Sequence, residues 1–238
     1  MSEEVLWPQW KELIDDALTS ACIRIIREPL LYFSEADLQQ FFVEALRAIE
    51  PLSKLYPTGV PTGKDAKSVY KTSLIHREYG GEKGRRIDIS IFSPEDVALI
   101  NTARLLRNNR YLKPVFAIEL GTEKTIDTSA HLENDLRKLQ DRVEGTGYII
   151  HFYKDTSLSR SGTLTRQSTE AKIERIFKEA FASLKDSSNI KIIAILLRTF
   201  RNQKKMWGKC EIFNGAEWEK TGIQNDTDLR SAILRRMD

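Results

Sequence analysis

An apolar run that ends in a carboxylate most constrains how this chain can fold. Residues 115–118 (Val-Phe-Ala-Ile) carry no polar side chain, and Glu119 follows them directly. Such a run is typical of a strand buried on both faces of a sheet, where a charge is costly unless another group pairs with it. The sequence therefore predicts a buried strand here and a partner for Glu119.

A second run of the same kind lies earlier in the chain, where two isoleucines flank Asp88. Two carboxylates on neighbouring strands repel each other, and a divalent cation is the usual way to keep both ionised. We therefore expect Asp88 and Glu119 to share one site. The alternative for Asp88 is an exposed edge strand on which it pairs with a nearby arginine: Arg77, Arg85 or Arg86.

Composition limits the classes to which the chain can belong. Its 238 residues are enough for one large domain, and 41% hydrophobic with 30% charged residues is typical of a globular protein. We find no apolar run long enough to span a bilayer and no features of a signal peptide, so we expect a cytoplasmic protein without a membrane partner. The two cysteines support neither a zinc site nor a disulfide framework. A net charge of +3 permits a polyanionic partner without requiring one.

The spacing of apolar residues predicts several amphipathic helices. Ser34 and Asp37 form a capping box at the start of the second one. Ser93, followed by a proline, is expected to cap another. The expected helices cover approximately residues 7–27, 35–50, 93–109, 130–143, 168–184 and 226–237.

Strands are expected between these helices, and residues 51–65 and 162–167 are expected to be loops. A strand, helix and strand in succession imply a parallel pair with a right-handed crossover. The chain is therefore predicted to be an α/β protein with a central mixed β-sheet flanked by helices. We expect one domain over 1–238, with its core at about 34–155 and elaborations at 7–27 and 168–237. The expected strands cover approximately residues 69–79, 85–92, 115–120, 148–153 and 190–197, with a hairpin at 211–218.

The order of these elements and acids resembles the PD-(D/E)XK nuclease superfamily. The residues that carry the resemblance are 34–37 (SEAD), 76–79 (HREY), 86–89 (RIDI) and 115–119 (VFAIE), and it covers roughly 34–153. The resemblance implies a restriction-endonuclease-like core and a Mg²⁺-dependent endonuclease that hydrolyses DNA in restriction or defence, with RNA not excluded. By analogy it also implies a homodimer, since cutting both strands is easiest with two sites.

Oxygen ligands suit Mg²⁺, for which Mn²⁺ is expected to substitute. The candidate ligands are the side chains of Asp88 and Glu119 and the backbone carbonyl of Leu120. The resemblance adds Glu35, which would reach the metal directly or through water. Glu35 is also typical of a residue that stabilises the start of a helix.

Members of the family have a lysine two residues after the strand acid, where it orients or deprotonates the attacking water. That position is Gly121 here. Lys124, just beyond the strand, and Lys138, on the polar stripe of the next helix, are candidate replacements, and we favour Lys124 slightly. Both lysines could instead be solvated surface charges. Gln140 could assist from the same helix, and His131 at its start is interpreted as structural.

Basic residues near the acids and in a later stretch beside Trp207 are candidates for contacts with a nucleic-acid backbone or an unstacked base. They could equally form an ordinary solvated surface. The candidate nucleic-acid-binding residues are Arg86, Arg104, Arg107, Lys204 and Lys205.

Two alternatives to an enzyme stay open at this point. One is a nuclease-like domain that has lost its lysine and only binds nucleic acid or a protein partner. The other is a structural domain whose strand acids are salt-bridged.

Overall fold

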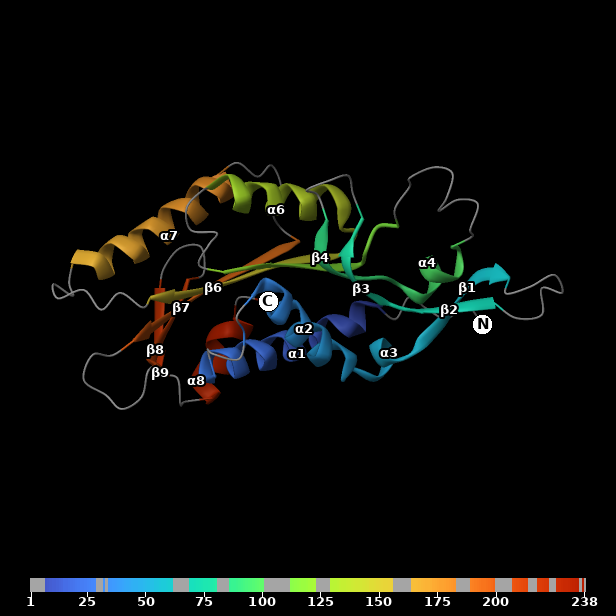
Figure 1. Cartoon of the computed structure of the whole chain (residues 1–238), viewed down its shortest axis with the longest axis horizontal. Coiled ribbons are helices and arrows are strands. Elements are labelled where there is room, and N and C mark those ends of the chain that lie inside the picture. The colour runs from blue at the N-terminus through green and yellow to red at the C-terminus, as the bar shows by residue number, and fades with distance from the viewer. Residues whose placement is uncertain are drawn as a thin grey trace.

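A central sheet covered by helices on both faces organises the chain (Figure 1). The computed structural model describes residues 7–28, 32, 34–61, 69–80, 86–100, 112–122, 129–155, 164–182, 189–199, 207–213, 218–222, 226–235 and 237. The α/β class and the mixed sheet are as the sequence predicts. Within these residues no helix has the length and apolar character needed to cross a membrane.

The sheet has seven strands whose spatial order is their order along the chain. The three central strands are parallel to one another, and every other neighbouring pair is antiparallel. The expected parallel pair on either side of a helix is thus confirmed. The strands are β3 (Ile75–Tyr79), β4 (Ile87–Ile91), β5 (Phe116–Gly121), β6 (Thr146–Asp155), β7 (Ile190–Thr199), β8 (Trp207–Phe213) and β9 (Trp218–Gly222).

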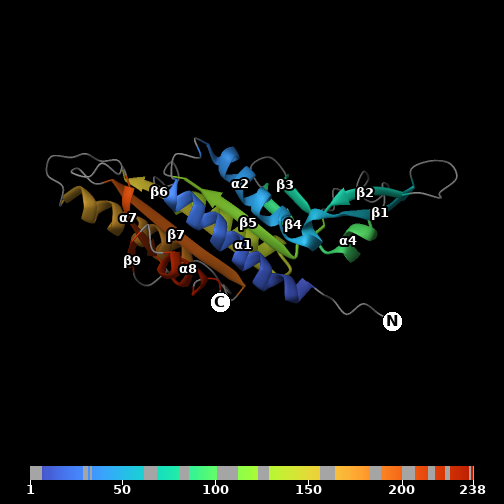
Figure 2. The same ribbon diagram turned by 90° about the horizontal axis from the view of Figure 1, so that it is seen from below.

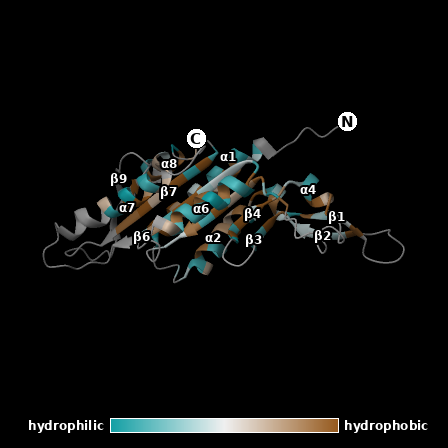
Figure 3. Ribbon diagram, turned by 90° about the horizontal axis from the view of Figure 1, so that it is seen from above, coloured by the Kyte–Doolittle hydropathy of each residue, from teal (hydrophilic) through white to brown (hydrophobic). Residues whose placement is uncertain are grey.

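Helices α1 (Trp7–Arg27), α2 (Glu35–Arg47) and α8 (Asp226–Leu234) lie on one face of the sheet. Helices α6 (Ser129–Arg142) and α7 (Leu164–Ala182) lie on the other (Figure 1). Seen from below in Figure 2, α1 and α2 lie over the sheet and run in roughly the same direction as β5 and β7. Seen from above in Figure 3, α6 carries mostly hydrophilic residues over hydrophobic strands.

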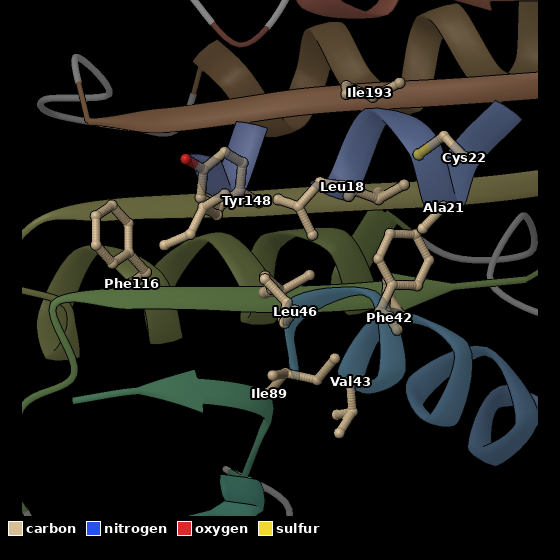
Figure 4. Packing of buried hydrophobic residues seen from close by; sticks show 14 of the residues in the cluster. Leu18, Ala21, Cys22, Phe42, Val43, Leu46, Ile89, Phe116, Tyr148 and Ile193 are labelled. Carbon is tan, nitrogen blue, oxygen red and sulfur yellow. The ribbon is translucent and has the colours of Figure 1, made fainter. Parts of the chain in front are cut away.

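Two hydrophobic clusters fill the spaces between the sheet and its two helical layers. In the larger one, Leu18 and Phe42 from the helices meet Ile89, Phe116 and Tyr148 from the strands (Figure 4). The smaller one lies under α6 and α7 and includes the predicted buried stripe of α6: Leu132, Leu136 and Leu139. Because both faces are covered, the central strands contain apolar runs, as residues 115–118 do.

The predicted capping box begins α2 and fixes where its first turn lies. Ser34 Oγ accepts a hydrogen bond from the Asp37 backbone N–H at 3.2 Å, and Asp37 Oδ2 accepts one from the Ser34 backbone N–H at 2.9 Å. The helix therefore starts at Glu35, whose side chain is directed from the first turn toward the sheet edge that carries β3 and β4.

The loop expected over 51–65 is wrong for 51–61, and 62–65 lie outside the described residues. It contains a short helix, α3 (Glu50–Ser53), and a strand, β1 (Leu55–Pro61). The single strand expected over 69–79 is in fact two, because β2 (Val69–Ser73) leaves the main sheet and pairs with β1 in a separate ribbon. Proline is tolerated in β1 because this strand has a neighbour on one side only.

Two predicted helix boundaries also need correction. The helix expected over 93–109 ends at Ala98, as α4 (Pro94–Ala98), with the Ser93 cap confirmed by its bond to the Asp96 backbone N–H. Helix α7 begins at Leu164, so part of the loop expected over 162–167 is helical.

Candidate functional site

Asp88 and Glu119 are both buried, with 7% and 2% of their surface exposed. The pairing of Ile89 with Ile118 sets the register of β4 and β5, which brings the two acids opposite each other where the pairing ends. The Leu120 backbone N–H donates to Asp88 Oδ2 at 2.7 Å. The two predicted acids therefore meet at one sheet end, and Asp88 does not lie on an exposed edge strand.

Gln39 on α2 connects these acids to the edge of the sheet. Its Nε2 donates to Asp88 Oδ1 at 3.2 Å and to Glu78 Oε1 at 2.8 Å. Its Oε1 accepts from Arg77 Nε at 3.3 Å. Arg77 thus bonds α2, at Gln39, Gln40 and the Ala36 carbonyl, and it reaches Asp88 only through Gln39. Sequence reasoning missed Gln39, although its place one turn after Glu35 on a capped helix was a usable signal.

Glu78 belongs to the 76–79 motif and was not among the predicted site residues, yet it lines the site. Its backbone φ of 50° lies in the left-handed region, which is uncommon for residues other than glycine. Backbone strain of this kind concentrates at functional sites because the surroundings must hold it. Nothing in the local sequence signals this conformation.

Lys138 supplies the partner that Glu119 needs. Its Nζ lies 2.7 Å from Glu119 Oε1 and 2.8 Å from Asp135 Oδ1, and it donates to the Arg86 backbone carbonyl at 3.1 Å. Only 13% of the Lys138 side chain is exposed. Lys138 is thus in contact with a strand acid, and Lys124, the other candidate, lies outside the described residues.

Asp135 is the second residue that sequence reasoning missed. It was expected on the polar stripe of this helix without a role in the site, and it is only 2% exposed. Its Oδ2 lies 3.4 Å from Nε2 of His131, which is itself 45% exposed. The available signal was its spacing of three residues before Lys138, which places both on one helix face.

A pocket of about 350 Å³ lies over these groups. Its polar lining combines five carboxylates with three basic residues, and Glu35 is among them as predicted. His131, which was interpreted as structural, also lines the pocket. The polar lining residues are Glu35, Glu78, Arg86, Asp88, Glu119, His131, Asp135 and Lys138.

Burial and mutual repulsion keep the acids hard to ionise. Burial raises the pKa of Asp88 to about 7, although the Leu120 N–H bond opposes the shift. Burial, then Asp135 and Asp88, raise the pKa of Glu119 well above its usual value. Burial alone would lower the pKa of Lys138, but Glu119 and Asp135 outweigh it and the pKa is raised. The site thus holds more negative charge than one ammonium group can neutralise.

Such a site suits a hard divalent cation, because five carboxylates line it beside only three basic residues, and oxygen ligands are the ones that Mg²⁺ prefers. The side chains of Asp88 and Glu119 and the Leu120 carbonyl are the candidate ligands. Glu35 is half-buried, and burial raises its pKa also. Among the described residues, no three His, Cys, Asp or Glu side chains are grouped closely enough to form a protein-only metal site. Mg²⁺ needs no such group, since it keeps several waters and takes few protein ligands.

Gly121 lies against the ring of His151 on the neighbouring strand. The two residues are register partners on β5 and β6, and a Cβ added at position 121 would lie 2.4 Å from His151 Cδ2. His151 is 1% exposed, and burial lowers its pKa to about 4, so the ring is neutral. Its Nδ1 is 3.0 Å from the Tyr153 hydroxyl. The His151 ring therefore occupies the space where a side chain at position 121 would begin.

The other predicted residues are distributed differently. Arg86 is exposed at the pocket and contributes its backbone carbonyl to Lys138. Gln140 is exposed and lines a different pocket, so it does not join this site. The remaining candidates lie outside the described residues: Arg85, Arg104, Arg107, Lys124, Lys204 and Lys205.

No family model, curated protein or solved structure matches this chain. The resemblance to PD-(D/E)XK nucleases thus stays a prediction that rests on the four quoted motifs.

Proposed function

We propose that this chain is a Mg²⁺-dependent endonuclease with a restriction-endonuclease-like core, and that it hydrolyses phosphodiester bonds in DNA. The observation that carries the proposal is the contact of Lys138 Nζ with Glu119 Oε1 beside the buried Asp88. The succession α2, β3, β4, β5, α6, β6, with two antiparallel pairs and then a parallel pair, supports it further. This is the order of elements on which the sequence resemblance rests.

Each residue of the site has a role in this reaction. Asp88, Glu119 and the Leu120 carbonyl would hold the cation, with Glu35 at their side. When bound, Mg²⁺ supplies positive charge for the phosphate and makes water more acidic. Lys138 would orient the attacking water or the phosphate through its ammonium group, which donates hydrogen bonds. Gln39 keeps Asp88 in place through the bond to Oδ1.

DNA is the proposed substrate because an acidic site that takes a divalent cation suits an anionic phosphodiester. Arg86 at the pocket would neutralise one phosphate. The basic residues Arg104, Arg107, Lys204 and Lys205 are proposed to contact the backbone on either side. A homodimer that cuts both strands, in restriction or defence, belongs to the same proposal.

Cleavage of supercoiled plasmid tests the function. We expect nicking or linearisation with Mg²⁺ or Mn²⁺, none with EDTA, and at least a hundredfold slower cleavage by Asp88→Asn and Glu119→Gln. Glu133→Gln, an acid-to-amide change on α6, is the matched control and should cleave normally. Failure to cleave plasmid, single-stranded DNA or RNA with either metal would overturn the enzyme. Cleavage that survives both substitutions would reject the site.

A second candidate is a nuclease-like domain that binds nucleic acid or a protein partner without cutting. It is favoured by the glycine at position 121, where the family has its lysine. Electrophoretic mobility shifts in EDTA separate the two candidates. Retained binding of DNA with no cleavage in either metal supports this second function.

A further inference from the structure

Asp135 is a buried carboxylate on the polar side of α6. Burying a charge is costly unless it is paired, so an aspartate that is 2% exposed requires close cationic partners. Its Oδ1 lies 2.8 Å from Lys138 Nζ, and its Oδ2 lies 3.4 Å from His131 Nε2. One carboxylate thus faces a cation inside the pocket and a histidine at the pocket lining.

Lys138 needs such a contact because its side chain is long and flexible. A lysine has four rotatable bonds, and a single acceptor leaves the ammonium group several positions to occupy. Here three acceptors surround Nζ: Glu119 Oε1, Asp135 Oδ1 and the Arg86 carbonyl. Of the three, only Asp135 lies on the same helix as Lys138, one turn before it, so the two move as one unit.

Position 121 of β5 has no room for a lysine that could pair with Glu119. The His151 ring fills the space next to position 121, on the same side of the sheet as Glu119, because alternate residues of a strand share a face. A phenylalanine of α7 packs edge-on against that ring, with the ring centres of His151 and Phe177 5.8 Å apart. The ring is therefore packed on both sides, and among the described residues the lysine that reaches Glu119 comes from α6.

We propose that Asp135 is a positioning residue that holds the Lys138 ammonium group against Glu119. The catalytic part of this inference rests on the proposed function. The placement of Lys138 does not rest on that function, and it can be measured without a cleavage assay. Asp135 is not proposed to contact the divalent metal or the phosphate, and it acts through Lys138.

Lysine acetylation tests the placement directly. Purified protein in EDTA is treated with limiting N-hydroxysuccinimidyl acetate, and the modification rate of each lysine is read by mass spectrometry. In the wild type we expect Lys138, whose side chain is 13% exposed, to react far more slowly than Lys178, which is 53% exposed. Equal rates in the wild type would overturn the proposal, even if no variant folds.

Asp135→Asn is the decisive variant because it removes the charge and keeps the shape. Loss of a charged partner corresponds to roughly a tenfold increase in the reactivity of Lys138. Asp135→Glu, which keeps the charge, should retain most of the protection, and Glu133→Gln on the same helix should change nothing. An unchanged Lys138 rate in folded Asp135→Asn would overturn the proposal.

Kinetics then separate this inference from the proposed function. If the wild type cleaves DNA, Asp135→Asn should lower kcat by about tenfold or more and leave KM nearly unchanged, since the phosphate contacts remain. An unchanged kcat would reject Asp135 as a positioning residue while the nuclease stands. Absence of cleavage in the wild type would reject the nuclease, and the acetylation result would still decide the placement of Lys138.

Discussion

Lys138 on α6 lies 2.7 Å from Glu119 on β5, although the residue two positions after Glu119 is a glycine. The leucine stripe of α6 packs on the sheet, and Lys138 lies on the flank of the helix beside this stripe, facing the end of β5. The ammonium group that position 121 does not provide thus comes from α6, the helix that follows β5.

Lys138→Met should reduce cleavage about a hundredfold or more, because it removes the ammonium group and keeps most of the side-chain volume. Single-turnover rates on a plasmid substrate measure the effect, and circular dichroism verifies the fold. Lys178→Met, an exposed lysine of α7, is the control and should be neutral. The opposite pattern, in which Lys124→Met is inactive and Lys138→Met is active, would assign the role to Lys124.

Metal-free protein should lose stability as pH rises through the range in which Asp88 ionises. Burial raises the pKa of Asp88 to about 7 from 3.8, so the folded state binds this proton more tightly than the unfolded chain does. The stabilisation that this proton gives to the folded state is complete below about pH 4 and is lost by about pH 7. Each pKa unit between the folded and unfolded states corresponds to about 1.4 kcal/mol of unfolding free energy. Urea denaturation in EDTA should show a smaller decline for Asp88→Asn than for the wild type. Asp141→Asn, an exposed change on α6, should follow the wild type; identical declines in all three would remove Asp88 as the cause.

Gly121→Ala should destabilise the protein by about 1–3 kcal/mol, because its Cβ would lie 2.4 Å from the His151 ring. Gly147→Ala is the control and should cost less, since its Cβ would lie 3.1 Å from Leu139 Cβ and Cδ1, a much milder overlap. In a His151→Ala background the added loss from Gly121→Ala should be much smaller. Thermal denaturation of the four combinations gives the coupling, and additive losses would mean that the two residues do not compete for space.

Tyr148→Phe should destabilise the protein by about 1–3 kcal/mol, because it leaves a buried acceptor without its donor. The Tyr148 hydroxyl donates to Asp15 Oδ1 at 2.6 Å and ties β6 to α1. Tyr70→Phe, on the exposed surface of β2, is the matched control. Equal urea midpoints for the two variants would show that this bond contributes nothing.

The strand acids were predictable because their surroundings are local. Residues 115–118 and the isoleucines beside Asp88 are apolar in a pattern that only a doubly covered strand explains, and both acids are buried as expected. The capping box and the leucine spacing likewise located Glu35 and the helix of Lys138. These features depend on residues close to one another in the chain.

The remaining parts of the site depend on contacts between distant segments. Whether Lys124 or Lys138 reaches Glu119 depends on how α6 sits on the sheet, and the role of Gly121 depends on His151 one strand away. Asp135 reads as a solvated residue until the sheet end covers it. Similarly, β1 was missed because its prolines are typical of a loop, and only its pairing with β2 reveals a strand.

A crystal soaked in Mn²⁺ shows whether Asp88 and Glu119 hold a divalent cation, because anomalous scattering locates the metal without reference to activity. We expect one anomalous peak in contact with the carboxylates of Asp88 and Glu119, with Lys138 still beside Glu119. We expect no peak there in Asp88→Asn crystals. Fully occupied Mn²⁺ elsewhere, with Asp88 and Glu119 bound only to Gln39 and Lys138, would contradict it.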